Sequence, residues 1–206
     1  MRMFILALTF ITSILTAQRA YATFAAGFQY GYGYFHYPNM KTHDNVPEGG
    51  QFQFHVGYLL TESLELEAFY GKQMYQAKAS INNNETFINH EASMLGVAFA
   101  MRMQSGLFLR FAYASTTITH ELARKLGDAD NELAQTTFGM LNQKKVGEYR
   151  TGIGYDLIDF SKATIFLSVE RGWYSELDAT DTVGFVGLKM SIDPNARPLK
   201  RKRRRN

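Results

Sequence analysis

The chain of 206 residues contains no cysteine. This absence excludes disulfide frameworks, thiolate zinc sites and cysteine nucleophiles, so histidines, carboxylates and hydroxyls are left for site chemistry. A chain of this length fits one domain better than two. One architecture is therefore expected to account for most of the sequence.

Beyond its first residues, the sequence also lacks any apolar run of the length of a membrane helix. A helix needs roughly 20 apolar residues to cross a bilayer, whereas charged residues interrupt every apolar segment of the remaining chain. A membrane domain in this protein would have to be built from strands.

The first 22 residues have the pattern of a secretory signal peptide. Arg2 precedes an apolar run from Phe4 to Leu15, and the small-x-small motif Ala20-Tyr21-Ala22 follows as a cleavage site. The alternative, a membrane anchor, is disfavoured because a run of about a dozen residues is too short to span a bilayer. We expect residues 1–22 to be removed on export.

The formal net charge of +3 conceals two regions of opposite sign. Nine of the 22 basic residues lie in the first 22 or the last ten residues, which leaves 13 basic against 19 acidic residues between them. The body of the protein is therefore acidic. Residues 194–206 form a basic tail that we expect to be disordered.

From Phe24 onward the dominant pattern has period two, which is typical of β-strands. In the first such segment, Phe24, Phe28 and Tyr32 alternate with Gly27 and Gln29. Eight segments of this kind are present, and they begin near Phe24, Gln51, Leu64, Leu95, Leu107, Glu148, Ile165 and Val186.

The connections between these segments are predicted to alternate between short and long. Short turns are expected at residues 61–63, 104–106 and 158–162, and long polar loops at 38–49, 77–87, 121–145 and 175–181. This alternation is typical of outer-membrane barrels, which have short turns at one end and loops at the other. With an even number of strands, both termini lie on the side of the short turns.

Charged residues share one parity of the strands, and the aromatic and aliphatic residues share the other. A carboxylate facing hydrocarbon costs several kcal/mol, so the charged parity is expected to face inward. The lumen of eight strands is just wide enough to be filled by side chains. The sequence therefore predicts a plugged lumen with an ion-pair network formed by Glu65, Glu67, Arg102, Arg110, Glu148, Arg150, Glu170 and Lys189.

The fold class predicted for residues 23–193 is all-β, an eight-stranded antiparallel up-and-down transmembrane β-barrel. The barrel has to be closed because an open sheet in lipid would leave two edges of unpaired backbone groups. Aromatic residues such as Tyr30, Tyr113 and Trp173 are expected in the interfacial girdles. Lys72 and Arg171 fall on the lipid-facing parity, where their charges need snorkelling or a bulge.

The chain resembles the OmpA- and OmpX-like small outer-membrane barrels over residues 23 to 192, in architecture and not through a catalytic motif. Gly187, Met190 and Ile192 match in part the assembly signal of the family's closing strand, and the basic tail departs from it. The resemblance implies location in the bacterial outer membrane. It also implies contact with outer-membrane lipid and lipopolysaccharide, and folding by the barrel assembly machinery.

No catalytic, cofactor-binding or metal site is predicted. The five histidines lie on separate segments without metal-ligand spacing. His90, Glu91 and Ser93 invite comparison with a lipid A deacylase family that carries a His, Ser and Glu constellation on the outside of such a barrel. Their spacing differs from that family's His-x-Ser pattern.

The leading functional hypothesis is a non-enzymatic envelope protein with a structural or surface-interaction role through its long extracellular loops. The loop at 121–145, which is expected to hold a short helix, is the best candidate for contact with a partner. The basic tail, Lys200 to Arg205, is expected to face the periplasm and attract an anionic partner. No nucleic-acid partner is expected. The alternatives are a narrow channel for ions or small solutes and a lipid A-modifying enzyme.

Overall fold

The computed structural model describes residues 23–37, 47–61, 63–81, 84–123, 143–160 and 163–191. The predicted signal peptide and the basic tail lie outside these ranges. The strands are β1 (Thr23–His36), β2 (Glu48–Leu59), β3 (Leu64–Ile81), β4 (Asn84–Arg102), β5 (Leu107–Leu122), β6 (Lys144–Asp159), β7 (Ala163–Tyr174) and β8 (Ala179–Ser191). Within the described ranges, no helix is long and apolar enough to cross a membrane.

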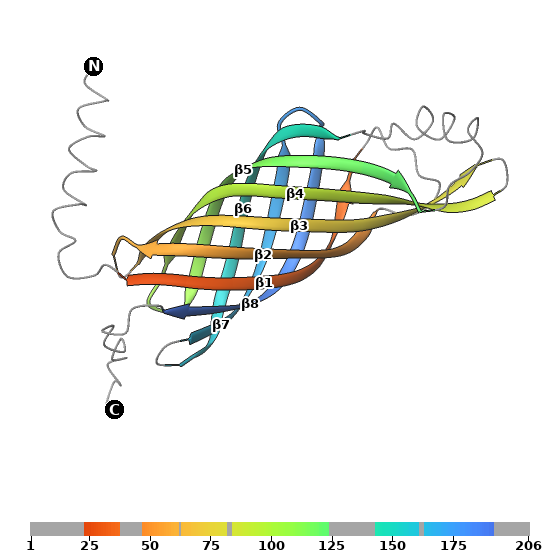
Figure 1. The fold of residues 1–206 in the computed structure, drawn as a ribbon. Coiled ribbons are helices and arrows are strands. Elements are labelled where there is room, and N and C mark those ends of the chain that lie inside the picture. The colour runs from red at the N-terminus through yellow and green to blue at the C-terminus, as the bar shows by residue number, and fades with distance from the viewer. Residues whose placement is uncertain are drawn as a thin grey trace, which may run out of the picture.

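The eight strands form one closed antiparallel barrel in chain order (Figure 1). Each strand pairs with its sequence neighbours, and β1 also pairs with β8, so that Phe28 lies opposite Phe54 on one side and Leu188 on the other. Closure gives every strand two hydrogen-bonded neighbours, which satisfies the backbone groups inside a bilayer. The predicted fold class is confirmed.

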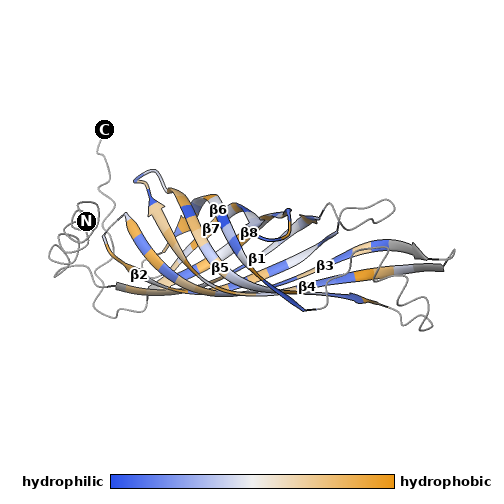
Figure 2. Ribbon diagram, turned by 90° about the horizontal axis from the view of Figure 1, so that it is seen from above, coloured by the Kyte–Doolittle hydropathy of each residue, from blue (hydrophilic) through white to orange (hydrophobic). Residues whose placement is uncertain are grey.

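Period-two alternation places apolar side chains on the outside of the barrel. Outward-facing Phe28 and Leu95 are 54% and 67% exposed, whereas inward-facing Gln29 is 2% exposed. Hydrophobic and hydrophilic residues alternate along the strands in Figure 2. An apolar exterior around a polar interior is the arrangement of a barrel whose solvent is lipid.

The two ends of the barrel differ less than the sequence analysis predicted. The connections after β2, β4 and β6 are short, and the pairing of Thr23 with Leu59 places the start of β1 at this same end, the short-turn end. At the opposite end, two of the four predicted long loops are wrong. β3 continues to Ile81 and β4 begins already at Asn84, and β7 is joined to β8 by a turn at residues 175–178.

Polar residues of these two segments belong to strands: Lys78 of β3 faces away from the barrel, and Asp181 of β8 faces the lumen. Ala77 is buried and its neighbour Lys78 is exposed, so the alternation of β3 continues through a stretch that polarity alone suggested was a loop. A strand that extends into water carries polar outward residues, which resemble loop residues in the sequence.

The sidedness of the strands reverses toward the end where β3 and β4 extend furthest, the projecting end (Figure 1). Along the outer face of β3, Tyr70 is followed by Lys72, Met74, Gln76 and Lys78, three of which are polar. The interior at this end is apolar, and its buried cluster contains Phe35, Tyr37, Tyr75, Ala77, Ile88, Ala92, Ile118, Val146, Tyr174, Leu177, Ala179, Val183 and Phe185. An apolar interior beneath a polar exterior is the arrangement of a water-soluble barrel, so the strands leave the bilayer here.

Two glycines of the lumen make room for aromatic rings near the short-turn end. A β-carbon at Gly154 would collide with the ring of Phe108, and one at Gly187 would collide with the ring of Phe166. These two rings pack edge to face with their centroids 5.6 Å apart. Glycine is therefore required at both positions for the rings to fill this part of the lumen.

Candidate functional site: the barrel lumen

Charged side chains from six strands meet inside the barrel. The structure places all eight residues of the predicted ion-pair network there, and seven of them are less than 10% exposed. Arg102, at the short-turn end, is the more exposed one, with 18% of its side chain accessible. Asp156 and Asp181 join them, so that four cations face six carboxylates among the described residues.

The layer nearest the short-turn end is held by Arg102 and Lys189. One nitrogen of Arg102, Nη1, donates to both carboxylate oxygens of Asp156 at 2.5 and 2.6 Å. Lys189 donates to Glu65 and, at 3.2 Å, to Glu67. Arg102 Nε also lies 3.7 Å from Glu65, which links the two cations through one carboxylate.

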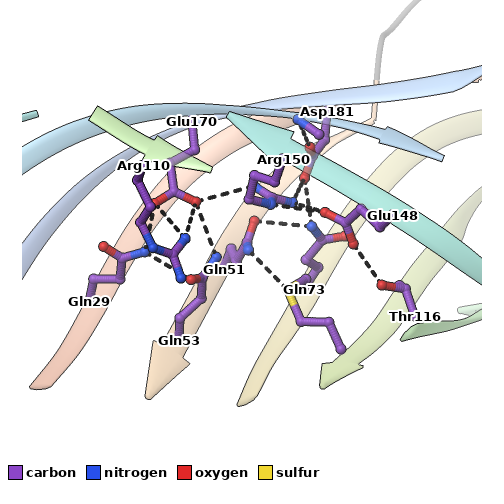
Figure 3. A network of polar contacts seen from close by, with 12 residues as sticks. Gln29, Gln51, Gln53, Gln73, Arg110, Thr116, Glu148, Arg150, Glu170 and Asp181 are labelled. Atoms are coloured by element: carbon purple, nitrogen blue, oxygen red, sulfur yellow. Dashed lines mark hydrogen bonds and ion pairs between the residues drawn. The ribbon is translucent and has the colours of Figure 1, made fainter. Parts of the chain in front are cut away.

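The middle layer is centred on Arg110. Its Nε donates to Glu67 Oε2 at 2.9 Å, and its Nη1 donates to the two oxygens of Glu170 at 3.0 and 3.1 Å. Gln29 Nε2 donates to Glu170 Oε1 at 3.2 Å (Figure 3). The guanidinium carbon also lies 4.8 Å from the ring centroid of Phe69. Contacts of this kind satisfy a buried cation on several sides.

The upper layer is centred on Arg150. Its Nη2 lies 2.5 Å from Glu148 Oε1 and 2.7 Å from Asp181 Oδ2, and its Nε donates to Glu148 at 2.9 Å (Figure 3). Thr116 donates to Glu148 at 2.7 Å, and Gln73 donates to Asp181 at 2.6 Å. Each carboxylate of this layer therefore accepts from a cation and from a neutral side chain.

Shared carboxylates join the three layers into one continuous network. Glu67 accepts from both Lys189 and Arg110, and Glu170 lies 3.1 Å or less from Arg110 Nη1 and 3.9 Å from Arg150 Nη1. A cavity of about 10 Å³ lies between the first two layers, among Glu67, Arg102, Arg110 and Lys189. That volume has room for about one water molecule.

An aromatic cluster with two histidines lies between this network and the projecting end. His90 and His120 are directly paired across β4 and β5, and His90 Nδ1 lies 2.8 Å from His120 Nε2. The ring centroid of His90 is 4.0 Å from that of Phe35 and 5.7 Å from that of Tyr75. These rings fill the lumen above the ion pairs.

Sequence reasoning missed two carboxylates and one histidine pair of this site. Asp156 lies on the inward parity two residues after Gly154, so the same alternation could have identified it. Asp181 was assigned to a loop, and β8 in fact begins before it. The contact between His90 and His120 depends on the register of β4 against β5, which residue spacing does not reveal.

The residues compared with a deacylase site do not converge. His90 is fully buried in the lumen, whereas Glu91 and Ser93 lie on the outward parity of β4. Glu91 pairs instead with Lys72 on the outer face, with 3.1 Å between Oε2 and Nζ. Within the described strands and turns, no group of three or more His, Asp or Glu side chains is arranged to hold a metal ion.

Comparison with known proteins rests on structure. No protein-family model matches the sequence, and no curated protein matches it in sequence. Among the similar solved structures is Ail, the attachment invasion locus protein of Yersinia pestis, crystallised with the heparin analogue sucrose octasulfate. It is 10% identical with a TM-score of 0.52, and the match covers 83% of this chain and 99% of Ail.

Neisserial surface protein A is also similar, at 9% identity and a TM-score of 0.50 over 81% of this chain and 96% of that protein. The fold is that of the small outer-membrane β-barrels. The predicted resemblance to the OmpA- and OmpX-like barrels is thereby confirmed at the level of the fold. Sequence identities this low support a shared fold and do not indicate a shared function.

Proposed function

We propose that this outer-membrane barrel is a non-enzymatic, non-conducting anchor that holds its projecting end at the cell surface. The observation that supports the proposal is the set of ion pairs that cross the lumen. Four cations and six carboxylates form ion pairs across the barrel, and a cavity of about 10 Å³ lies among Glu67, Arg102, Arg110 and Lys189. A hydrated ion would need a wider path, which this network would have to open by breaking buried ion pairs.

Single-channel recording in planar bilayers tests the closed lumen. We expect no steady openings from the refolded wild-type barrel. The double variant Arg110→Ala, Arg150→Ala is the matched positive control, because it removes both central guanidiniums and leaves carboxylates that attract cations and water. Steady wild-type openings that are abolished by Arg102→Ala or Glu65→Ala would support the alternative, a narrow channel.

A surface-interaction role is proposed for the projecting end. The long segment predicted at 121–145 joins β5 to β6 there, and residues 124–142 of it lie outside the described residues. The β3–β4 hairpin extends at the same end. Surface loops carried by a rigid scaffold are common sites of binding. Binding of whole cells or envelope components should fall when residues 124–142 are replaced by a short linker, and unchanged binding would refute the role of this segment.

A lipid A-modifying activity is the competing function, and the outward position of Ser93 against the inward position of His90 argues against that dyad. Mass spectrometry of lipid A from cells that express the protein tests it directly. We expect an unchanged lipid A profile. Loss or gain of an acyl chain that depends on expression would refute the non-enzymatic proposal.

The remaining partners are proposals that follow from the fold and from charge. The barrel assembly machinery would insert the strands, and the basic tail at residues 194–206 would face the periplasm and bind an anionic partner there. Such binding would weaken as salt is raised. Truncation at residue 193 should abolish retention on anionic vesicles at low salt while leaving the barrel folded.

A further inference from the structure

The outer surface of the barrel has an apolar groove over β6, β7 and β8. Its volume is about 500 Å³, within the range of small-ligand sites. Outward-facing Ile153, Leu167, Val169 and Val186 line it. Gly184 also lines it, is exposed, and has no atom within 4 Å of where a β-carbon would be. The groove therefore lies in the apolar belt and is open to acyl chains.

A row of hydrogen-bond donors lies at the end of this groove that is nearer the projecting end. Arg171 is the next outward residue of β7 after Val169, about 7 Å further along the strand. Thr151 on β6 and Thr182 on β8 are its direct cross-strand partners, so a threonine stands on each side of Arg171 in the sheet. Donors in this arrangement suit the oxygens of a phosphate.

Arg171 lacks the acidic neighbour that the other lipid-side cation has. Lys72 pairs with Glu91 at 3.1 Å, whereas among the described residues no carboxylate lies within ion-pair distance of Arg171. Its recorded contact is with the ring of Trp173, whose centroid is 5.7 Å away. Trp173 is the next outward residue toward the projecting end, and tryptophan prefers the membrane interface. The Arg171 charge thus lies at headgroup level and needs an anion.

We propose that this surface is a binding site for an anionic phospholipid-type ligand, whose acyl chain lies in the groove at Gly184 and whose phosphate is held by Arg171, Thr151 and Thr182. Charge favours this occupant over a second copy of the chain, because the outward positions beside the groove offer Arg171 no complementary carboxylate on the same barrel face. Both parts of the ligand are matched: an apolar chain to an apolar groove, and a phosphate to one cation and two hydroxyls.

Native mass spectrometry of the refolded barrel in detergent tests the site with defined probes. Dimyristoyl phosphatidylglycerol and dimyristoyl phosphatidylcholine have identical chains, so a difference between them reports the headgroup. We expect the wild type to retain phosphatidylglycerol preferentially. Arg171→Gln should weaken this binding about fivefold, the contribution of one basic residue near an anionic lipid surface. Lys145→Gln, which removes an exposed cation of β6 away from the groove, should leave binding unchanged.

The groove is tested separately by Gly184→Leu, a change whose β-carbon meets no protein atom. Each methylene excluded from an apolar site weakens binding about fourfold, so displacement of two should weaken it about 15-fold. Folding of each variant is checked by heat-modifiable migration in gels. Equal losses in Arg171→Gln and Lys145→Gln, or unchanged binding in Gly184→Leu, would overturn the proposal. A dimer that Gly184→Leu dissociates would overturn it too, by assigning the groove to a second copy.

Discussion

Replacement of Arg110 by methionine should be among the most destabilising single changes in the barrel. Methionine keeps most of the side-chain length but leaves Glu67 and Glu170 without the three hydrogen bonds at 2.9, 3.0 and 3.1 Å that Arg110 supplies. Both carboxylates keep one other cation, Lys189 at 3.2 Å for Glu67 and Arg150 at 3.9 Å for Glu170. Removal of one partner of a buried pair costs about 3–5 kcal/mol, and this residual pairing places Arg110→Met near the lower value.

Equilibrium unfolding in urea from phospholipid vesicles measures this cost. The sequence contains one tryptophan, Trp173, which faces outward on β7 and reports insertion through its fluorescence. The matched control is Lys72→Met, because Lys72 pairs with Glu91 on the exposed surface and such pairs contribute about 0–1 kcal/mol. Equal losses of stability in the two variants would refute the claim that the luminal network is buried and interdependent.

A second substitution distinguishes a lost charge pair from lost packing. The double variant Arg110→Met, Glu170→Gln also removes the negative charge of Glu170, which Arg110 neutralises in the wild type. The buried negative charge that Arg110→Met leaves at this position is therefore absent. The double variant should be at least about 1 kcal/mol more stable than the sum of the single losses predicts, since residues in one network are not additive. Strict additivity would mean that the destabilisation arises from packing alone.

Three further predictions concern other parts of the barrel. Gly187→Ala should cost about 1–3 kcal/mol in urea unfolding because its methyl group meets the ring of Phe166, whereas Gly184→Ala should be near neutral. Asp181→Asn should cost about 1–3 kcal/mol in the same assay, because the amide cannot accept from Arg150 and Gln73 as the carboxylate does. Trp173 fluorescence should be quenched more by lipids brominated near the headgroup than by lipids brominated near the chain ends. The reverse order would contradict the interfacial position of Trp173.

The strands and their sidedness could be predicted from the sequence because both follow from a local period of two. Glu65 and Arg110 face inward for the same reason that Leu66 and Phe111 face outward, and that reason involves only neighbours along the chain. The partners of each charge could not be predicted. Lys189 meets Glu65 because β8 closes the barrel against β1 and both side chains reach across the lumen, a relation between residues 124 positions apart.

The limits of the strands at the projecting end were the least predictable feature. Polar residues were interpreted as loop signals at 77–87 and 175–181. β3 and β4 instead continue into water, where an outward lysine such as Lys78 is an ordinary strand residue. The sequence signal of this extension is the apolar character of Ala77 and Ile88, which the structure buries inside the barrel.

The sidedness of β4 inside the bilayer is the central claim, and the absence of native cysteine makes it directly measurable. Single cysteines at Val97, Ala98, Phe99 and Ala100 would be exposed to a thiol reagent dissolved in the bilayer, with urea-unfolded protein as the control for equal intrinsic reactivity. Positions 97 and 99, which are 55% and 37% exposed, should react, and positions 98 and 100, which are 2% and 1% exposed, should be protected. Uniform reactivity along the four positions, or protection of 97 and 99 instead, would contradict the account.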